Sequence, residues 1–99
     1  MEGHHITPPG PDETWHNSPP VFPREAALLG EHGTVEVLIH VGPDGRATGV
    51  DVIKSSGWPV LDRAVLDAAR DWHFQPGQRD GVPVASELPF RVVFSRGRQ

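Results

Sequence analysis

The chain contains no cysteine among its 99 residues, so neither a disulfide framework nor a thiolate zinc site can form. Lysine is nearly absent as well, because Lys54 is the only one. Residues 1–32 carry five acidic side chains and one basic one, a net charge of −4, whereas residues 33–99 carry eight of each. Without clustered lysine and arginine, the chain is poorly equipped to bind nucleic acid.

Long apolar runs are missing too. No segment approaches the roughly 18 apolar residues that a membrane-spanning helix needs. The first residues lack the apolar core of a signal peptide. We therefore expect the given residues to be soluble and any membrane anchor to lie outside them. Their number suffices for one domain.

The first part of the chain is rich in proline and shows no apolar periodicity. We predict a disordered or extended tail over residues 1–17 and a domain over residues 18–99. Residues 1–5 are either a cloning remnant or native sequence. Trp15 is unusual in such a tail; it is either a stray aromatic or one that tucks onto the domain.

A β-hairpin is predicted next. From Thr34 to Val41 apolar and polar residues alternate, which indicates a strand with one buried face. Gly42-Pro43-Asp44-Gly45 is a strong turn signal, and a second strand follows over residues 46–54. The apolar spacing changes around Gly49, which favours a β-bulge there.

Two helices are predicted around this hairpin. Residues Arg24 to Leu29 lie between Pro23 and Gly30 and favour a short helix, which must dock through Ala26, Ala27 and Leu29. A longer helix opens at Pro59 and is ended by Pro76-Gly77. Its apolar stripe at helical spacing is Leu61, Ala64, Val65, Ala68, Ala69 and Trp72.

The last strand is predicted from Val84 to Ser95. Its buried face comprises Val84, Ser86, Leu88, Phe90, Val92 and Phe94. Proline cannot donate a ladder hydrogen bond, so Pro89 indicates an edge strand. An edge strand has a free row of backbone groups, and we expect another protein's extended segment to add itself there.

These elements predict an α+β fold with a ββαβ core. One main helix packs on one face of a three-stranded antiparallel sheet, and a short N-terminal helix precedes it. The other face of the sheet would be partly open to water or to a partner.

Catalysis and metal binding are disfavoured by the same sequence. The six histidines match no zinc spacing, although an exposed pair such as His4-His5 can chelate weakly. His40, Ser55 and Ser56 could be assembled into a triad on paper, but no nucleophile elbow supports it. We therefore predict no enzyme activity and no cofactor, and turn to interaction chemistry.

An ordered set of motifs resembles the C-terminal domain of TonB-family energy transducers over residues 20–94. The motifs are P-V-F-P-R-E-A (20–26), G-T-V-E-V-L-I-H-V-G-P-D-G-R (33–46), S-S-G (55–57), L-D-R-A-V-L-D-A-A-R-D-W-H-F-Q-P (61–76) and G-V-P-V (81–84). Each motif alone is weak. Their order and spacing together are specific, and they cover about three-quarters of the chain.

The resemblance implies a periplasmic domain tethered to the inner membrane by a helix and a proline-rich spacer. Such proteins work with inner-membrane proton-driven motor proteins and pull on TonB-dependent outer-membrane receptors for siderophores and similar cargo. The receptor's short N-terminal box adds a strand beside the last strand of the domain. The implied partner-binding residues here are Pro20, Val21, Phe22, Pro23, Val84, Ser86, Leu88, Phe90, Arg91, Val92, Val93 and Phe94.

The sequence departs from the family pattern in one contact region. The family's Gln-Pro-x-Tyr-Pro motif reads Ser18-Pro19-Pro20-Val21-Phe22-Pro23 here, so hydrogen bonds from the glutamine and tyrosine side chains are not available.

No membrane helix or long spacer is present, which favours an excised domain over a free-standing relative. Two alternatives stay open: a same-fold module with a non-transporter periplasmic partner, and a homodimer made by exchanging strands at the free edge.

Overall fold

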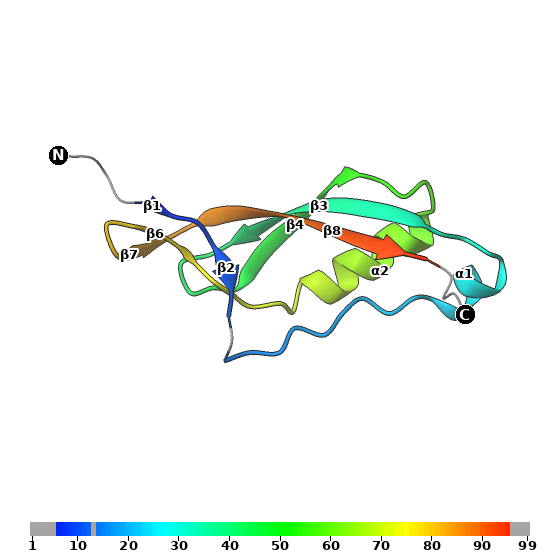
Figure 1. The fold of residues 1–99 in the computed structure, drawn as a ribbon, viewed down its shortest axis with the longest axis horizontal. Helices are drawn as coiled ribbons and strands as arrows, with labels where there is room; N and C mark the ends of the chain where they lie inside the picture. The colour runs from blue at the N-terminus through cyan, green and yellow to red at the C-terminus, as the bar shows by residue number, and fades with distance from the viewer. Residues whose placement is uncertain (1–5, 13, 96–99) are drawn as a thin grey trace.

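The computed structural model describes residues 6–12 and 14–95. The alternatives for residues 1–5, a cloning remnant or native sequence, and the weak chelation by His4-His5 lie outside the described residues. The main sheet is antiparallel with the strand order β4 (Ala47–Lys54), β3 (Gly33–Val41) and β8 (Ser86–Phe94). Helix α2 (Pro59–Ala69) lies across one face of this sheet (Figure 1). The predicted α+β fold is confirmed.

The alternation in β3 builds the centre of the core. Its inward residues Val35, Val37, Ile39 and Val41 are fully buried, against Leu61, Val65 and Ala69 of α2. The intervening residues of β3 are only partly covered, as the period of two requires. Strand β3 is thus central to the sheet in both sequence pattern and position.

Two β-bulges interrupt the β3–β4 pairing. Val41 faces Ala47 and His40 faces Gly49, which leaves Thr48 as an extra residue. Glu36 faces Lys54 and Val37 faces Val52, which leaves Ile53 extra. The first bulge lies beside Gly49, where the change in apolar spacing predicts it. No change in spacing predicts the second.

Helix α2 begins where predicted and ends earlier than predicted. Trp58 is the N-cap residue and Pro59 the first helical residue, but the helix ends at Ala69. Beyond it, the Phe74 N–H donates to the Gly45 carbonyl at 2.7 Å. This bond, with that from the Ala47 N–H to the Trp72 carbonyl, ties the segment after α2 to the β3–β4 hairpin. Trp72 is buried, but it lies in the segment that follows α2 and not in the helix.

Helix α1 (Arg24–Leu28) is shorter than predicted, and most of its predicted docking residues are exposed. Only Ala26 is buried, whereas Ala27 is exposed and Leu29 is 76% exposed. A single helical turn presents only one position toward the core, so the prediction of docking through Ala27 and Leu29 is wrong. Pro23 is the N-cap residue and Arg24 the first helical one.

The predicted last strand is two strands. Val84 belongs to β7 (Val82–Val84), which forms a tight hairpin with β6 (Gly77–Arg79). The hairpin turn uses Asp80 and Gly81, whose positive φ values of 51° and 83° suit a two-residue turn. Strand β8 begins at Ser86, after Ala85 interrupts the regular pairing.

The N-terminal segment lies against the domain. Strand β1 (Ile6–Thr7) pairs with β6, and β2 (Gly10–Pro11) pairs with β5 (Phe74–Gln75). The segment between β2 and α1 then runs along the length of the domain on the side of α2 (Figure 1). The boundary between tail and domain at residue 17 stays a prediction.

Candidate interaction edge

Strand β8 is an edge strand, as Pro89 predicts. Within residues 6–12 and 14–95, β3 is the only strand that pairs with β8. The β3–β8 register is unbroken from Gly33 opposite Phe94 to Val41 opposite Ser86. The backbone of β8 therefore presents one straight flank that no described strand covers.

Pro89 fixes which backbone groups of β8 face this flank. In an antiparallel ladder, pairs that exchange both N–H···O bonds alternate with pairs that exchange none. Pro89 is opposite Leu38 and has no N–H, so this pair belongs to the second kind. The peptide groups of Pro89 thus point away from β3, and by the same alternation so do those of Glu87, Arg91 and Val93.

The β3–β4 turn leads to the same assignment independently. Gly42 donates its N–H to the Arg46 carbonyl at 2.9 Å, so the backbone of Gly42 faces β4. The Thr48 hydroxyl also donates to the His40 carbonyl at 3.2 Å. The backbone N–H and carbonyl groups of even-numbered residues of β3, including Leu38, therefore point toward β4. Those of odd-numbered residues point toward β8. Val92, opposite Val35, has its N–H directed at β3 and not at the free flank.

The opposite edge of the sheet is less suited to accept a strand. Strand β4 carries the two bulges at Thr48 and Ile53, and bulges disrupt the regular spacing of ladder groups. Strand β8 has no bulge over its whole paired length. Of the two edges, only β8 offers regularly spaced backbone groups, and it lacks one donor, at Pro89.

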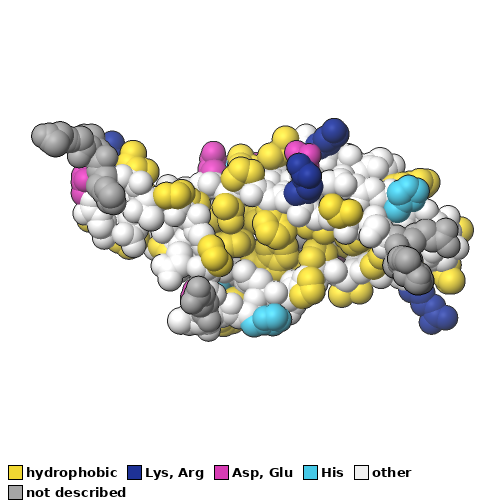
Figure 2. Space-filling model, viewed as in Figure 1, with side chains coloured by type: hydrophobic (Ala, Val, Ile, Leu, Met, Phe, Trp, Pro, Cys, Tyr) yellow, Lys and Arg dark blue, Asp and Glu magenta, His cyan; other side chains and the backbone are white. Residues whose placement is uncertain are grey.

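A groove follows the free flank of β8 on its inner side. It encloses a cavity of about 350 Å³ between β8 and the N-terminal segment. Its lining residues are Asn17, Pro19, Pro20, Trp72, Phe74 and the run from Phe90 to Val93. Figure 2 shows hydrophobic side chains gathered in a hollow in the middle of this face. The Trp72 ring packs edge-on against Phe90 at a centroid distance of 5.1 Å.

The N-terminal segment is held beside the groove by side-chain contacts. Asn17 donates its side-chain N–H to the His73 carbonyl at 2.9 Å and accepts the His73 N–H at 2.8 Å. The Trp72 indole N–H donates to the Ser18 carbonyl at 2.7 Å. Trp15 stacks on the His73 ring with 4.0 Å between the centroids. We call these residues the His73 clasp: Trp15, Asn17, Ser18, Trp72 and His73.

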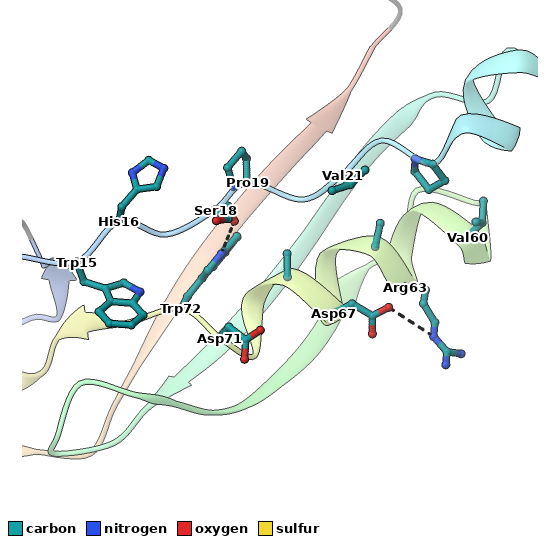
Figure 3. A pocket seen from close by; sticks show the side chains of 13 residues that line it. Trp15, His16, Ser18, Pro19, Val21, Val60, Arg63, Asp67, Asp71 and Trp72 are labelled. Carbon is teal, nitrogen blue, oxygen red and sulfur yellow. Dashed lines mark hydrogen bonds and ion pairs between the residues drawn. The ribbon is translucent and has the colours of Figure 1, made fainter.

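A second cavity, of about 600 Å³, lies on the other side of the N-terminal segment, against α2 (Figure 3). Trp15, Val21 and Val60 contribute apolar surface to it, and Asp67 and Asp71 contribute charge. Trp72 and Pro19 line both cavities.

The predicted contact segment Pro20–Pro23 is divided between two environments. Phe22 packs edge-on against Phe94 with 5.3 Å between ring centroids, so its ring belongs to the core. Val21 is 77% exposed and lines the cavity against α2. Pro20 lines the groove beside β8. Of the residues predicted on the last strand, Val84 lies outside β8, in the hairpin with β6.

Charged side chains lie on the outer face of the sheet. His40 is central, with its Nε2 2.7 Å from Asp51 Oδ2 of β4 and its Nδ1 3.5 Å from Glu87 Oε2 of β8. Arg91 approaches Glu36 at 4.0 Å. These pairs are solvent-exposed and so contribute little to stability. In the described part of the chain, no three histidine, aspartate or glutamate side chains come together as a metal site.

Asp62 stabilises the start of α2. Burial raises the pKa of Asp62, but hydrogen bonds from the Ser55 hydroxyl, the Ser56 N–H and the Ser56 hydroxyl outweigh it. The pKa of Asp62 is therefore held below its ordinary value. The carboxylate fixes the Ser55-Ser56 loop and thereby the position of α2 on the sheet.

The sequence-based interpretation missed the clasp. Asn17 and His73 are 56 residues apart, and neither has a local signal that predicts their contact. Trp15 is the only indication, since tucking onto the domain is one of its two interpretations. Among the described residues, no helix has the length and apolar character needed to cross a membrane.

The fold defines a small α+β domain with an antiparallel sheet, whose edge strand β8 pairs only with β3 among the described residues. Residues 18–95 match the family described as Gram-negative bacterial TonB protein C-terminal, and the chain belongs to this family. The chain is 37% identical over 78 residues to Protein TonB of Xanthomonas campestris pv. campestris, covering 79% of this chain and 35% of that protein. It is 38% identical over 76 residues to Protein TonB of Pseudomonas aeruginosa, covering 77% of this chain and 22% of that protein.

The fold is similar to a solved structure. The solution NMR structure of the Pseudomonas aeruginosa TonB CTD superposes with a TM-score of 0.72 at 30% sequence identity. The match covers 95% of this chain and 89% of that one. By contrast, the chain spans about a third or less of the length of the two curated relatives described above.

Proposed function

We propose that this domain is the receptor-binding part of a TonB-like energy transducer in the periplasm, tethered to the inner membrane in the full-length protein. The N-terminal box of an outer-membrane transporter adds a strand to β8, and inner-membrane motor proteins act through other parts of the full-length protein. The observation that carries the proposal is the regular free flank of β8. Family membership supports the transducer role, and the domain itself performs no chemistry.

The free flank supplies a main-chain ladder for the incoming strand. Glu87, Arg91 and Val93 each offer an N–H and a carbonyl, and Pro89 offers a carbonyl alone. A hydrogen bond contributes about 0.5–1.5 kcal/mol net, so about five of them give about 3–7 kcal/mol before the costs of association. The ladder alone therefore falls short of the roughly 8 kcal/mol that a micromolar dissociation constant requires, and the expected affinity on the order of micromolar needs apolar side-chain contacts as well.

Weak equilibrium binding is compatible with transmitting force. A pull directed along the strands loads the ladder bonds in shear, so they resist together. Strand β8 itself is held by β3 over its whole length, from Ser86 to Phe94. Force applied to the incoming strand is thus passed to the centre of the sheet, as the proposed task, import of siderophores or other cargo, requires.

The side chains on the inner face of β8 contribute surface for the partner, together with the Pro20–Pro23 segment. We assign Pro20 and Val21 to the contact surface and Phe22 to the core, because its ring packs on Phe94. The absence of a tyrosine hydroxyl at position 22 then removes no partner contact.

Isothermal titration calorimetry with a peptide carrying the N-terminal box of a TonB-dependent receptor tests the proposal. We expect a dissociation constant on the order of micromolar for the box peptide and at least about tenfold weaker binding for a scrambled peptide of the same composition. Equal binding of both peptides, or of neither across a panel of receptor boxes, would reject the proposed function.

A further inference from the structure

The groove beside β8 has two walls of different origin. One wall is β8 itself, from Phe90 to Val93, and the floor is formed by Trp72 and Phe74. The other wall is the N-terminal segment, through Asn17, Pro19 and Pro20. Asn17 lies outside the residues that match the family, which begin at Ser18. Pro19 and Pro20 lie within the family match, so only the Asn17 end of this wall lies outside it.

The hydrogen bonds of the clasp hold this wall in place, and none of them is made by the backbone of β8. Asn17 exchanges two hydrogen bonds with the His73 backbone, and Trp72 donates to the Ser18 carbonyl. In the described part of the chain, no backbone hydrogen bond joins residues 14–20 to β8. The wall thus borders the free flank and leaves its ladder groups available.

We propose that the His73 clasp holds the N-terminal segment as the second wall of a specificity groove, which takes apolar side chains of the strand added to β8. The inference rests on the proposed function. In an added strand, alternate side chains point to the same face as Phe90 and Val92, which is the face toward α2. Two side chains spaced two residues apart therefore enter the groove.

The chemistry of the groove selects apolar side chains. Its lining is mainly proline, tryptophan, phenylalanine and valine, and its volume of about 350 Å³ is at the lower end of the roughly 300–1,000 Å³ of ligand pockets. This size suits side chains rather than a whole ligand. The opposite face of the added strand meets Glu87 and Arg91, which are exposed and tolerate polar residues.

Two heptapeptides isolate the side-chain contribution from the ladder. One carries valine at positions 3 and 5 and polar residues elsewhere; the other carries threonine at positions 3 and 5. They share every main-chain group, and threonine differs from valine by one hydroxyl in place of a methyl. We expect the wild-type protein to prefer the valine peptide by about tenfold, because the groove would bury a hydroxyl without a partner.

The matched variants are Asn17→Ala, which breaks the clasp, and His16→Ala, an exposed neighbour outside it. We expect the preference for valine to fall below about threefold in N17A and to persist in H16A. The Trp72 indole N–H resonance reports whether the segment has been released, and circular dichroism confirms that the sheet is intact. Trp15→Ala provides a second break of the clasp.

The outcomes separate the two proposals. A preference that is unchanged in both N17A and W15A, with the Trp72 resonance shifted, overturns the specificity groove and leaves strand addition standing. Amide resonances of Glu87, Arg91 and Val93 that respond to neither peptide overturn strand addition and the groove together.

Discussion

Pro89 faces Leu38 at the centre of the β3–β8 ladder, and its nitrogen is directed to the unpaired flank. The flank thus lacks one donor at the place where strand addition is proposed. Pro89→Val would restore this donor with a good strand former. We expect box peptides to bind this variant about two- to tenfold more tightly, since one hydrogen bond contributes about 0.5–1.5 kcal/mol.

Calorimetric titration measures this gain. Pro83→Val is the matched control, because Pro83 lies in β7, away from the groove, and should leave the dissociation constant unchanged. Unchanged or weaker binding by the Pro89 variant would show that the nitrogen of residue 89 does not face the incoming strand.

Proline substitutions at neighbouring positions should separate binding from folding. Arg91 has its N–H on the free flank and Val92 has its N–H on β3, so R91P removes a partner donor and V92P removes a ladder bond. We expect R91P to keep its fold and to bind box peptides about two- to tenfold more weakly, since one hydrogen bond is lost. V92P should lose about 1–3 kcal/mol of unfolding free energy, because the Val35 carbonyl is left without its donor.

Urea unfolding and peptide titration of both variants check this prediction. The sequence does not orient the N–H groups of Arg91 and Val92, and the β3–β8 register assigns them to opposite flanks. If R91P unfolded and V92P bound peptide normally, the assignment of the two flanks would be reversed.

Asp62 predicts a pH dependence of stability. Its folded pKa is lowered by hydrogen bonds from Ser55 and Ser56, so its contribution is complete above the unfolded pKa and is lost as pH falls through the folded pKa. We expect Asp62→Asn to cost about 1 kcal/mol at pH 7. The difference from wild type should shrink below about pH 4.

Urea unfolding at pH 7 and at pH 3 provides the measurement. Asp67→Asn is the matched control on the exposed face of α2, where weak surface ion pairs contribute less than about 0.5 kcal/mol. A difference between D62N and wild type that grew on acidification would contradict the lowered pKa of Asp62.

Gly45 lies in the β3–β4 turn, which is hydrogen-bonded to Phe74 in the floor of the groove, and Gly57 is a matched control for it. Both have positive φ, at 88° and 92°, so alanine costs about 1–2 kcal/mol at either position. At Gly45 a Cβ would also collide with the Phe74 carbonyl oxygen, whereas at Gly57 it meets open space. We expect Gly45→Ala to be the more destabilising by at least about 1 kcal/mol in thermal or urea unfolding. Equal costs would contradict the close approach of this turn to Phe74.

The sequence is sufficient for the parts of the fold that follow from local pattern. Alternation in β3 predicts which valines are buried, and Pro89 predicts an edge strand without knowledge of the pairing. Both features depend on backbone geometry within a few residues. Motif order then identifies the family, which residues 18–95 confirm.

Other features required the tertiary structure. Trp72 continues a helical stripe in the sequence, but α2 ends at Ala69, and the segment after it is held by the bond from Phe74 to Gly45. Leu29 resembles a docking residue because propensity does not show which side of a single turn faces the core. The bonds between Asn17 and His73 join distant segments, so no local spacing could predict the clasp.

Strand addition to β8 can be observed residue by residue through chemical-shift mapping with a receptor box peptide. We expect the largest amide changes at Glu87, Arg91 and Val93, with smaller ones across β4 and the turn at residues 42–46. Changes concentrated on β4 or that turn, with β8 silent, would contradict strand addition at this edge.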